Sequence, residues 1–128
     1  MRLTLGKDEK LKSKKAIEQL FVEGSRIKSF PLQLVYLKTT HHAEALVKVG
    51  FTVPKRAVKL AVDRIRIKRI MREVYRKNKH LFSENLKEHY VFMFIYMTNK
   101  EVNQENLESS IKNISEKFLI KITNNEQS

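Results

Sequence analysis

The sequence predicts an α/β fold of the α+β kind, a two-layer sandwich in which about three helices pack on a small mixed sheet. Apolar residues recur at helical spacing in three stretches, alternate along two others and form one continuous apolar run. The length of 128 residues and the hydrophobic content of 41% suit one core of modest volume. A single domain is therefore expected over residues 1–128, with its core at about 10–122 and frayed ends.

The first expected element is a short amphipathic helix from Ser13 to Glu23. Ser13 is a suitable N-cap, and Gly24 is a natural stop at the other end. Apolar residues lie between them at helical spacing, namely Ala16, Ile17, Leu20 and Phe21. This spacing gives the helix one apolar face, which is typical of a helix that packs on a core.

Two strands are expected next, over residues 32–38 and 45–53, because side chains in both stretches alternate between two faces. The first strand has Leu32, Leu34 and Tyr36 on one face and Gln33, Val35 and Leu37 on the other. The two strands are expected to form a hairpin around residues 39–44. The order of strands in the sheet is not predicted.

Three further elements complete the expected fold. A long basic helix is expected from Ala57, or a little later, to Lys79, and a buried strand at 90–97. A last helix is expected over 104–122, followed by a polar, frayed tail. Its inward residues would be Leu107, Ile111, Ile114 and Phe118.

Composition excludes several kinds of chemistry. Because the chain has no cysteine, it has no disulfide, no thiolate nucleophile and no cysteine-bound zinc. The highly charged N-terminus has no apolar stretch of signal-peptide length, and the run at 91–97 is too short to span a bilayer. A cytoplasmic protein is therefore expected. The net charge of +12 favours a polyanionic partner, and nucleic acid is preferred to an anionic membrane.

Most of this charge lies in one segment, residues 55–79. It holds eleven basic residues against two acidic ones, which is a net +9 of the total +12. The basic residues are Lys55, Arg56, Lys59, Arg64, Arg66, Lys68, Arg69, Arg72, Arg76, Lys77 and Lys79. Packed cations repel one another unless a polyanion compensates them, so this composition favours nucleic-acid binding over a merely solvated helix.

A helical wheel separates this segment into two sides. Its apolar side, directed at the core, is formed by Ile67, Ile70, Met71 and Val74. Its basic side is formed by Lys68, Arg69, Arg72 and Arg76, with Arg64 and Arg66 flanking the apolar side. The planar arginine fork suits bidentate phosphate contacts and stacking on bases, which indicates RNA more than a lysine-only surface would.

Two sequence stretches resemble a known family. VGFTVPKR at 49–56 and AVDRIRIKRIMRE at 61–73 are similar to the signature of bacterial ribonuclease P protein subunits. The hallmark of that family is an Arg-Asn-Arg element followed by Lys-Arg and Arg-Glu. Leu11-Lys12, Leu20-Phe21 with Gly24, and Leu34-Val35-Tyr36 resemble its first helix and first strand. The resemblance covers about residues 10 to 120.

The resemblance implies a ribosomal-protein-S5-like fold and the role of a non-catalytic protein subunit. In such a holoenzyme a catalytic RNA removes the 5′ leader of precursor transfer RNA, using Mg²⁺ that the RNA and its substrate hold. The implied partners are the catalytic RNA and precursor transfer RNA, with one protein per RNA. No DNA, membrane, protein-bound metal or protein catalytic residue is implied.

The resemblance also assigns roles to residues. Contacts to the RNA are implied for Lys55, Arg56, Lys59, Arg64, Arg66, Lys68, Arg69, Arg72 and Arg76. A cleft between the first helix and the sheet would take the leader, lined by Phe21, Leu34 and Tyr36. Tyr36 is the preferred candidate for stacking on a base. Ordinary core packing is an equally good reading of Phe21.

Two positions depart from the family pattern. Ile65 stands where the family has its central asparagine, and the wheel places Ile65 in the middle of the basic side. An isoleucine cannot make the hydrogen bonds of that asparagine. Ile17 stands where the family favours phenylalanine, so one stacking platform of the cleft is expected to be absent.

Other functions remain as alternatives at this stage. A structural RNA-binding protein of the ribosomal type would show the same charge without any role in cleavage. A DNA-binding regulator is disfavoured because no recognition helix with base-reading asparagine or glutamine is evident. An independent nuclease would need a catalytic cluster, and the histidines and paired carboxylates have no suitable spacing for one.

Overall fold

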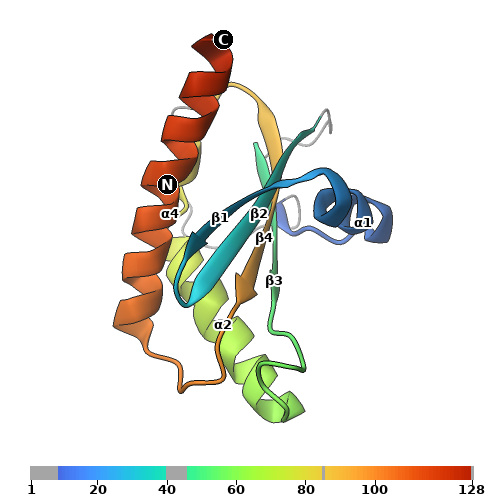
Figure 1. Ribbon diagram of the computed structural model, residues 1–128, viewed down its shortest axis with the longest axis vertical. Coiled ribbons are helices and arrows are strands. Elements are labelled where there is room, and N and C mark those ends of the chain that lie inside the picture. The colour runs from blue at the N-terminus through green and yellow to red at the C-terminus, as the bar shows by residue number, and fades with distance from the viewer. Residues whose placement is uncertain (1–8, 40–45, 85, 128) are drawn as a thin grey trace.

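The computed structural model describes residues 9–39, 46–84 and 86–127 (Figure 1). Four helices and four strands make up the described chain. In chain order they are α1 (Lys14–Glu23), β1 (Ser25–Ser29), β2 (Leu32–Thr39), β3 (Val47–Thr52), α2 (Ala61–Asn78), α3 (His80–Ser83), β4 (His89–Tyr96) and α4 (Gln104–Gln127). None of the helices described is both long and apolar enough to cross a bilayer.

The four strands form one mixed sheet in the order β1-β2-β4-β3. β1 pairs antiparallel with β2, β2 pairs antiparallel with β4, and β3 pairs parallel with β4. The hairpin expected between the strands at 32–38 and 45–53, which are β2 and β3, is therefore wrong, because β4 lies between them. Its expected turn at 39–44 lies almost wholly outside the described residues. The hairpin that does exist joins β1 to β2 through Phe30 and Pro31.

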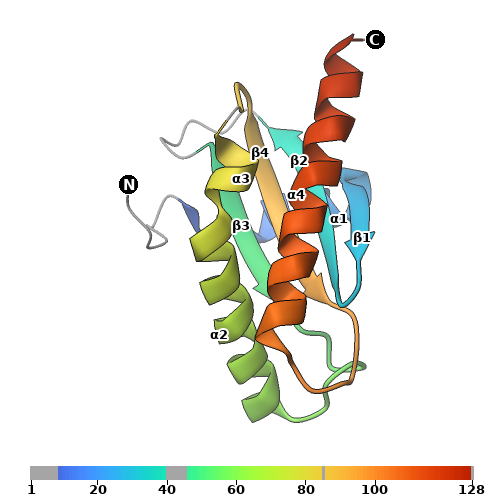
Figure 2. The same cartoon turned by 90° about the vertical axis from the view of Figure 1, so that its left-hand side faces the viewer.

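Helices cover both faces of the sheet (Figures 1 and 2). α2 and α4 lie side by side on one face, which confirms the predicted α+β class and its helical layer. α1 lies on the opposite face, against β2 and β4. Each face has its own apolar cluster, and alternate residues of β2 contribute to one or the other.

The larger cluster, between the sheet and α2 with α4, is rich in aromatic rings. The ring of Phe118 on α4 meets that of Phe92 on β4 edge to face, with centroids 5.1 Å apart. Phe82, which the short helix α3 supplies, lies 5.4 Å from Phe92 and 5.9 Å from Phe94. Such pairs add to the stabilisation that comes from burying apolar area.

Several expected boundaries are confirmed, and others change. Ser13 caps α1, since its Oγ accepts a hydrogen bond of 3.2 Å from the Ala16 amide. α2 begins at Ala61, within the expected range. The helix expected to end at 122 instead continues to Gln127, because the tail contains no glycine or proline to stop it. β1 was not predicted, because in its sequence SRIKS only Ile27 is apolar.

The buried hydroxyl of Tyr75 on α2 makes the stability of the fold depend on pH. Its side chain is 2% exposed, and burial, helped by the negative charge of Glu9, raises the pKa of its hydroxyl far above the usual value. The unfolded chain releases this proton near pH 10, whereas the folded chain keeps it. The folded state is therefore fully favoured below about pH 10 and loses stability as the pH rises further.

We expect Tyr75→Phe to reduce this alkaline loss. The variant keeps the aromatic ring, which packs on Phe51 and Phe94, but removes the ionisable hydroxyl. The slope of unfolding free energy against pH above about 10 should become shallower by up to about 1.4 kcal/mol per pH unit. Urea unfolding of both proteins across this range measures it. Parallel slopes would mean that burial of Tyr75 is not the cause.

Candidate nucleic-acid interface

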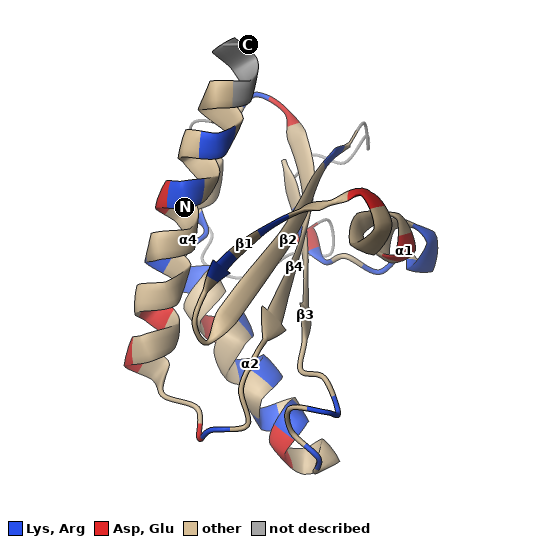
Figure 3. Ribbon diagram, viewed as in Figure 1, with Lys and Arg blue, Asp and Glu red and all other residues tan. Residues whose placement is uncertain are grey.

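The buried side of α2 fixes which of its cations face solvent. Ile67, Met71 and Val74 are at most 3% exposed, and they pack in the cluster beneath the sheet. Ile70 is half-buried against the same cluster. Cations of the other side, together with those of the loop between β3 and α2, therefore point outward. Figure 3 shows this basic region around the N-terminal half of α2.

Arg64 is hydrogen-bonded to the protein's own backbone. Its guanidinium donates hydrogen bonds to the carbonyl oxygens of Val58 and Lys59, at 2.9 and 2.7 Å. These bonds tie the start of α2 to the preceding loop. Because that loop carries Lys55, Arg56 and Lys59, Arg64 positions other cations while part of its own donor capacity is used.

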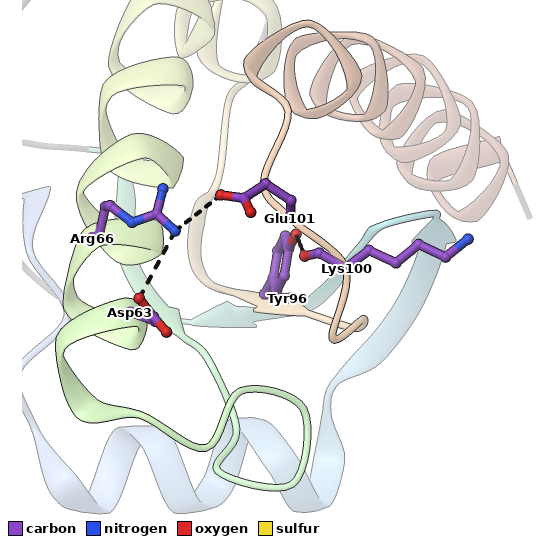
Figure 4. Close-up of polar contacts among 5 residues, drawn as sticks. All are labelled: Asp63, Arg66, Tyr96, Lys100 and Glu101. Carbon is purple, nitrogen blue, oxygen red and sulfur yellow. Dashed lines mark hydrogen bonds and ion pairs between the residues drawn. The ribbon is translucent and has the colours of Figure 1, made fainter.

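Arg66 is paired with carboxylates (Figure 4). Its guanidinium lies 3.3 Å from Glu101 and 3.9 Å from Asp63. Glu101 belongs to the loop before α4, where the Tyr96 hydroxyl donates a hydrogen bond of 2.9 Å to the Lys100 carbonyl. Burial, followed by the charge of Glu101, raises the pKa of Tyr96. The charge of Arg66 is therefore partly neutralised by Glu101 and Asp63. To bind RNA, Arg66 would have to exchange a carboxylate partner for a phosphate.

Two further arginines of α2 have internal contacts. Arg76 forms an ion pair with Glu73, and the hydrogen bond from Arg76 is the largest cause of the lowered pKa of Glu73. The guanidinium of Arg72 lies over the ring of Phe51, 6.0 Å from its centroid. Phe51 leaves the fork of Arg72 available for other partners, since a ring face takes up no hydrogen-bond donor.

The remaining cations expected to contact RNA have no carboxylate partner among the described residues. They are Lys55, Arg56, Lys59, Lys68 and Arg69. With Arg72 they form what we call the α2 surface. Ile65 lies beside them and is 59% exposed, as the wheel predicted. The α2 surface therefore combines unneutralised cations with one apolar side chain that could pack on a ribose or base.

The second candidate region is a groove on the α1 face of the sheet, with a volume of about 360 Å³. It is lined by Phe21, Arg26, Gln33, Thr52, Pro54, Arg56 and Ile95. Phe21 is 37% exposed, and the guanidinium of Arg26 lies 6.0 Å from the centroid of its ring. We call this the α1 groove. An exposed ring beside one arginine, in a groove that a second arginine also lines, is an arrangement that can hold a base and its flanking phosphates.

Leu34 and Tyr36 do not line this groove, which corrects the expectation for them. Leu34 is fully buried and Tyr36 is 6% exposed, and both belong to the cluster on the opposite face. The Tyr36 ring packs edge to face on Phe118 with centroids 5.1 Å apart, and burial raises the pKa of its hydroxyl. A strand has a side-chain period of two, so the even-numbered residues of β2 face α4.

Gln33 and Arg26 are the groove residues that sequence reasoning missed. Gln33 stands among the apolar residues of β2 that face the α1 side of the sheet, and this polar interruption was the available signal. Arg26 lies on β1, which was not predicted, so no signal placed it. The groove thus keeps Phe21 from the expected cleft, takes Arg56 from the expected RNA contacts, and gains Thr52, Pro54 and Ile95 as well as these two residues.

The described residues contain no group of three histidine, aspartate or glutamate side chains able to hold a metal ion. His41 and His42 lie outside the described part of the chain. The geometry therefore offers cations and a groove for a polyanion, and no assembled protein metal centre within that part.

Comparison with known proteins identifies the family. The family model "Ribonuclease P" matches residues 5–119. A ribonuclease P protein component of Porphyromonas gingivalis is 36% identical over 91 residues, covering 71% of this chain and 66% of that protein. One of Chlorobaculum tepidum is 41% identical over 85 residues, covering 64% of this chain and 55% of that protein. The matched segment thus spans less than two thirds of these relatives.

Solved structures agree in fold. The RNase P protein of Thermotoga maritima superposes with a TM-score of 0.68 at 18% identity, covering 85% of this chain and 96% of that one. That of Staphylococcus aureus gives 0.64 at 17% identity, covering 90% and 94%. The basic helix, its preceding loop and the groove thus lie on a fold that this family also has. The chain belongs to the family of bacterial ribonuclease P protein components.

Proposed function

We propose that this chain is the protein subunit of a ribonuclease P holoenzyme. It binds the catalytic RNA and the 5′ leader of precursor transfer RNA, and it promotes endonucleolytic removal of the leader to give mature 5′ ends. The observation that supports this most is the α2 surface, whose cations have no carboxylate partner among the described residues. The catalytic RNA carries the chemistry, and no protein side chain takes part in bond cleavage.

The two regions suit different parts of the RNA. The α2 surface combines cations of the helix with cations of the loop that Arg64 ties to the start of the helix, so it can match a fixed set of phosphates on the folded catalytic RNA. The α1 groove offers an exposed ring with arginines beside it, which suits unpaired nucleotides whose bases can stack. Mg²⁺ bound by the RNA and its substrate would activate the attacking water. We propose one protein per catalytic RNA, acting in the cytoplasm.

The test is cleavage of a precursor transfer RNA by the catalytic RNA at low Mg²⁺, with and without this protein. We expect the protein to restore cleavage at the correct position, because its cations replace part of the charge neutralisation that Mg²⁺ otherwise supplies. RNA binding without any effect on cleavage would instead support a structural RNA-binding protein. Cleavage by the isolated protein, with all RNA removed, would overturn its non-catalytic role.

Phe21 gives a sharper test of the α1 groove. We expect Phe21→Ala to weaken holoenzyme binding of precursor by about 1 to 3 kcal/mol, because one stacked base is lost, and to leave binding of mature transfer RNA unchanged. Val22→Ala is the matched control, since Val22 neighbours Phe21 on α1 and is 83% exposed. Equal losses for precursor and mature RNA would mean that Phe21 serves the fold.

A further inference from the structure

α4 presents a polar stripe along the outer edge of the sheet. Its members follow one another at three- or four-residue spacing and are Asn106, Ser110, Asn113, Lys117 and Lys121. This stripe flanks the apolar one that packs in the core. It faces β1, as Figure 2 shows for the two elements. This polar stripe lies on the β1 side of α4, whereas α2 lies along the other side of the same helix (Figure 2).

Four hydrogen bonds fix this stripe to β1 and its turn. Ser110 Oγ donates to the Phe30 carbonyl at 2.6 Å, and Asn113 Nδ2 donates to Ser29 Oγ at 3.0 Å. One and two turns further along the helix, the ammonium groups of Lys117 and Lys121 donate to the carbonyls of Lys28 and Arg26 at 3.2 and 3.3 Å. The two lysines are therefore held along the edge.

Two hollows lie between α4 and β1 with its turn. One, of about 310 Å³, is lined by Arg26, Ile27, Lys28, Lys117, Ile120 and Lys121. The next, of about 460 Å³, is lined by Ser29, Phe30, Pro31, Asn106, Ser109, Ser110 and Asn113. Among the residues that the structure describes, no aspartate or glutamate lines either hollow. Phe30 is 67% exposed, with the Lys100 ammonium 5.9 Å from its ring centroid. We call the two hollows together the edge groove.

The backbone of β1 shows which occupant fits. Because the carbonyls of Arg26 and Lys28 point away from β2, the N–H groups of the same residues point outward as well. Lysine ammoniums cover those carbonyls, so the edge offers donors and positive charge but no uncovered acceptor at these positions. An added β-strand would need both donors and acceptors. A phosphate chain needs donors and cations only.

Arg26 joins this surface to the α1 groove, because it lines both. Its guanidinium lies over Phe21 on the α1 face, while its carbonyl faces Lys121 on the other side of the edge. A strand of RNA that crosses the α1 groove toward β1 would therefore leave it at the start of the edge groove. Beyond Arg26 it would find Lys117, Lys121 and the exposed ring of Phe30.

We propose that the edge groove is a second binding site for single-stranded RNA, which takes the part of the 5′ leader that extends beyond the α1 groove. Phosphates contact Lys117, Lys121 and the outward N–H groups of β1, and a base stacks on Phe30. The site rests on the proposed function, since it presupposes a leader in the α1 groove.

The test measures affinity of the reconstituted holoenzyme for precursors whose leaders are lengthened one nucleotide at a time. With the native protein we expect affinity to rise first as the leader fills the α1 groove. We expect a second rise in affinity once the leader is long enough to pass β1 and enter the edge groove. The double variant Lys117→Gln, Lys121→Gln should lose that second rise, which is about 10-fold for two phosphate contacts at 0.15 M salt. Precursors with short leaders should bind equally well to both proteins.

Two matched variants complete the design. Lys38→Gln with Lys87→Gln removes the same charge from exposed positions outside all three surfaces, and it should keep the second rise. Lys117→Arg with Lys121→Arg keeps the charge and should also keep it. If the Lys117→Gln, Lys121→Gln variant retains the second rise, or if the native protein shows none, the edge groove is not a leader site. If the native protein fails to bind short leaders or promote cleavage, the proposed function itself fails.

Discussion

Replacing Lys68, Arg69 and Arg72 with glutamine is expected to lower the affinity for the catalytic RNA on the order of 100-fold at 0.15 M salt. These cations lie on one side of α2, and none has a carboxylate partner within the described chain. Each lost phosphate contact also lowers the slope of log affinity against log salt by about 0.7 to 0.9. The slope should therefore fall by two to three units, roughly, across a salt titration.

The matched control removes three lysines from other exposed positions, Lys38, Lys87 and Lys112. It changes the net charge equally, so it measures the general attraction between a basic protein and RNA. We expect it to change the slope far less than the α2 variant. Equal changes would show that binding depends on net charge alone and would remove the α2 surface from the interface.

Phe118→Ala is expected to destabilise the fold by about 3 to 5 kcal/mol. The Phe118 ring is fully buried and contacts Tyr36, Tyr90 and Phe92 on two strands, so it joins α4 to the middle of the sheet. Its removal leaves a cavity among rings that cannot easily collapse. Because a domain of this size has a total stability of about 5 to 15 kcal/mol, the loss would be a large part of it.

Urea unfolding measures this change, and Ile120→Ala is the control on the same helix. Ile120 is 61% exposed, so its truncation should alter the unfolding free energy by no more than about 0.5 kcal/mol. A loss below about 1 kcal/mol for Phe118→Ala would mean that α4 is not essential to the core. In that event α4 could detach from the sheet without unfolding it.

The sequence predicted the helices better than the sheet, and the reason is the range of the interactions. The start of α1 is set by Ser13 and its residues by local apolar spacing, both of which are visible in the chain. The pairing of β3 with β4 depends on contacts across 40 or so residues, and alternation within each strand says nothing about them. β1 is held at the edge by side chains of α4, such as Lys117, so its own five residues gave little signal.

The sequence predicted where the charges of the site lie, but not which residues of the protein those charges contact. The cations of α2 and the exposure of Ile65 followed from the helical wheel. The contacts of Arg66 with Glu101, and of Arg64 with backbone carbonyls of the loop, arise from the folded chain and were not foreseen. Tyr36 was placed in the cleft although alternation had already put it on the face opposite Gln33, so the strand period was correct and the choice of face was wrong.

The position of β4 has a consequence for synthesis of the chain. β4 pairs with both β2 and β3, yet its residues 89–96 follow both of them by many positions. While the chain leaves the ribosome, β1 and β2 can meet as a hairpin, but β3 can pair only through its single bridge from Val49 to Lys10 until β4 emerges. During this interval β2 and β3 lack the β4 strand that pairs with both, and β2 also lacks the cover of α4, so the nascent protein is most exposed to aggregation and most in need of chaperones.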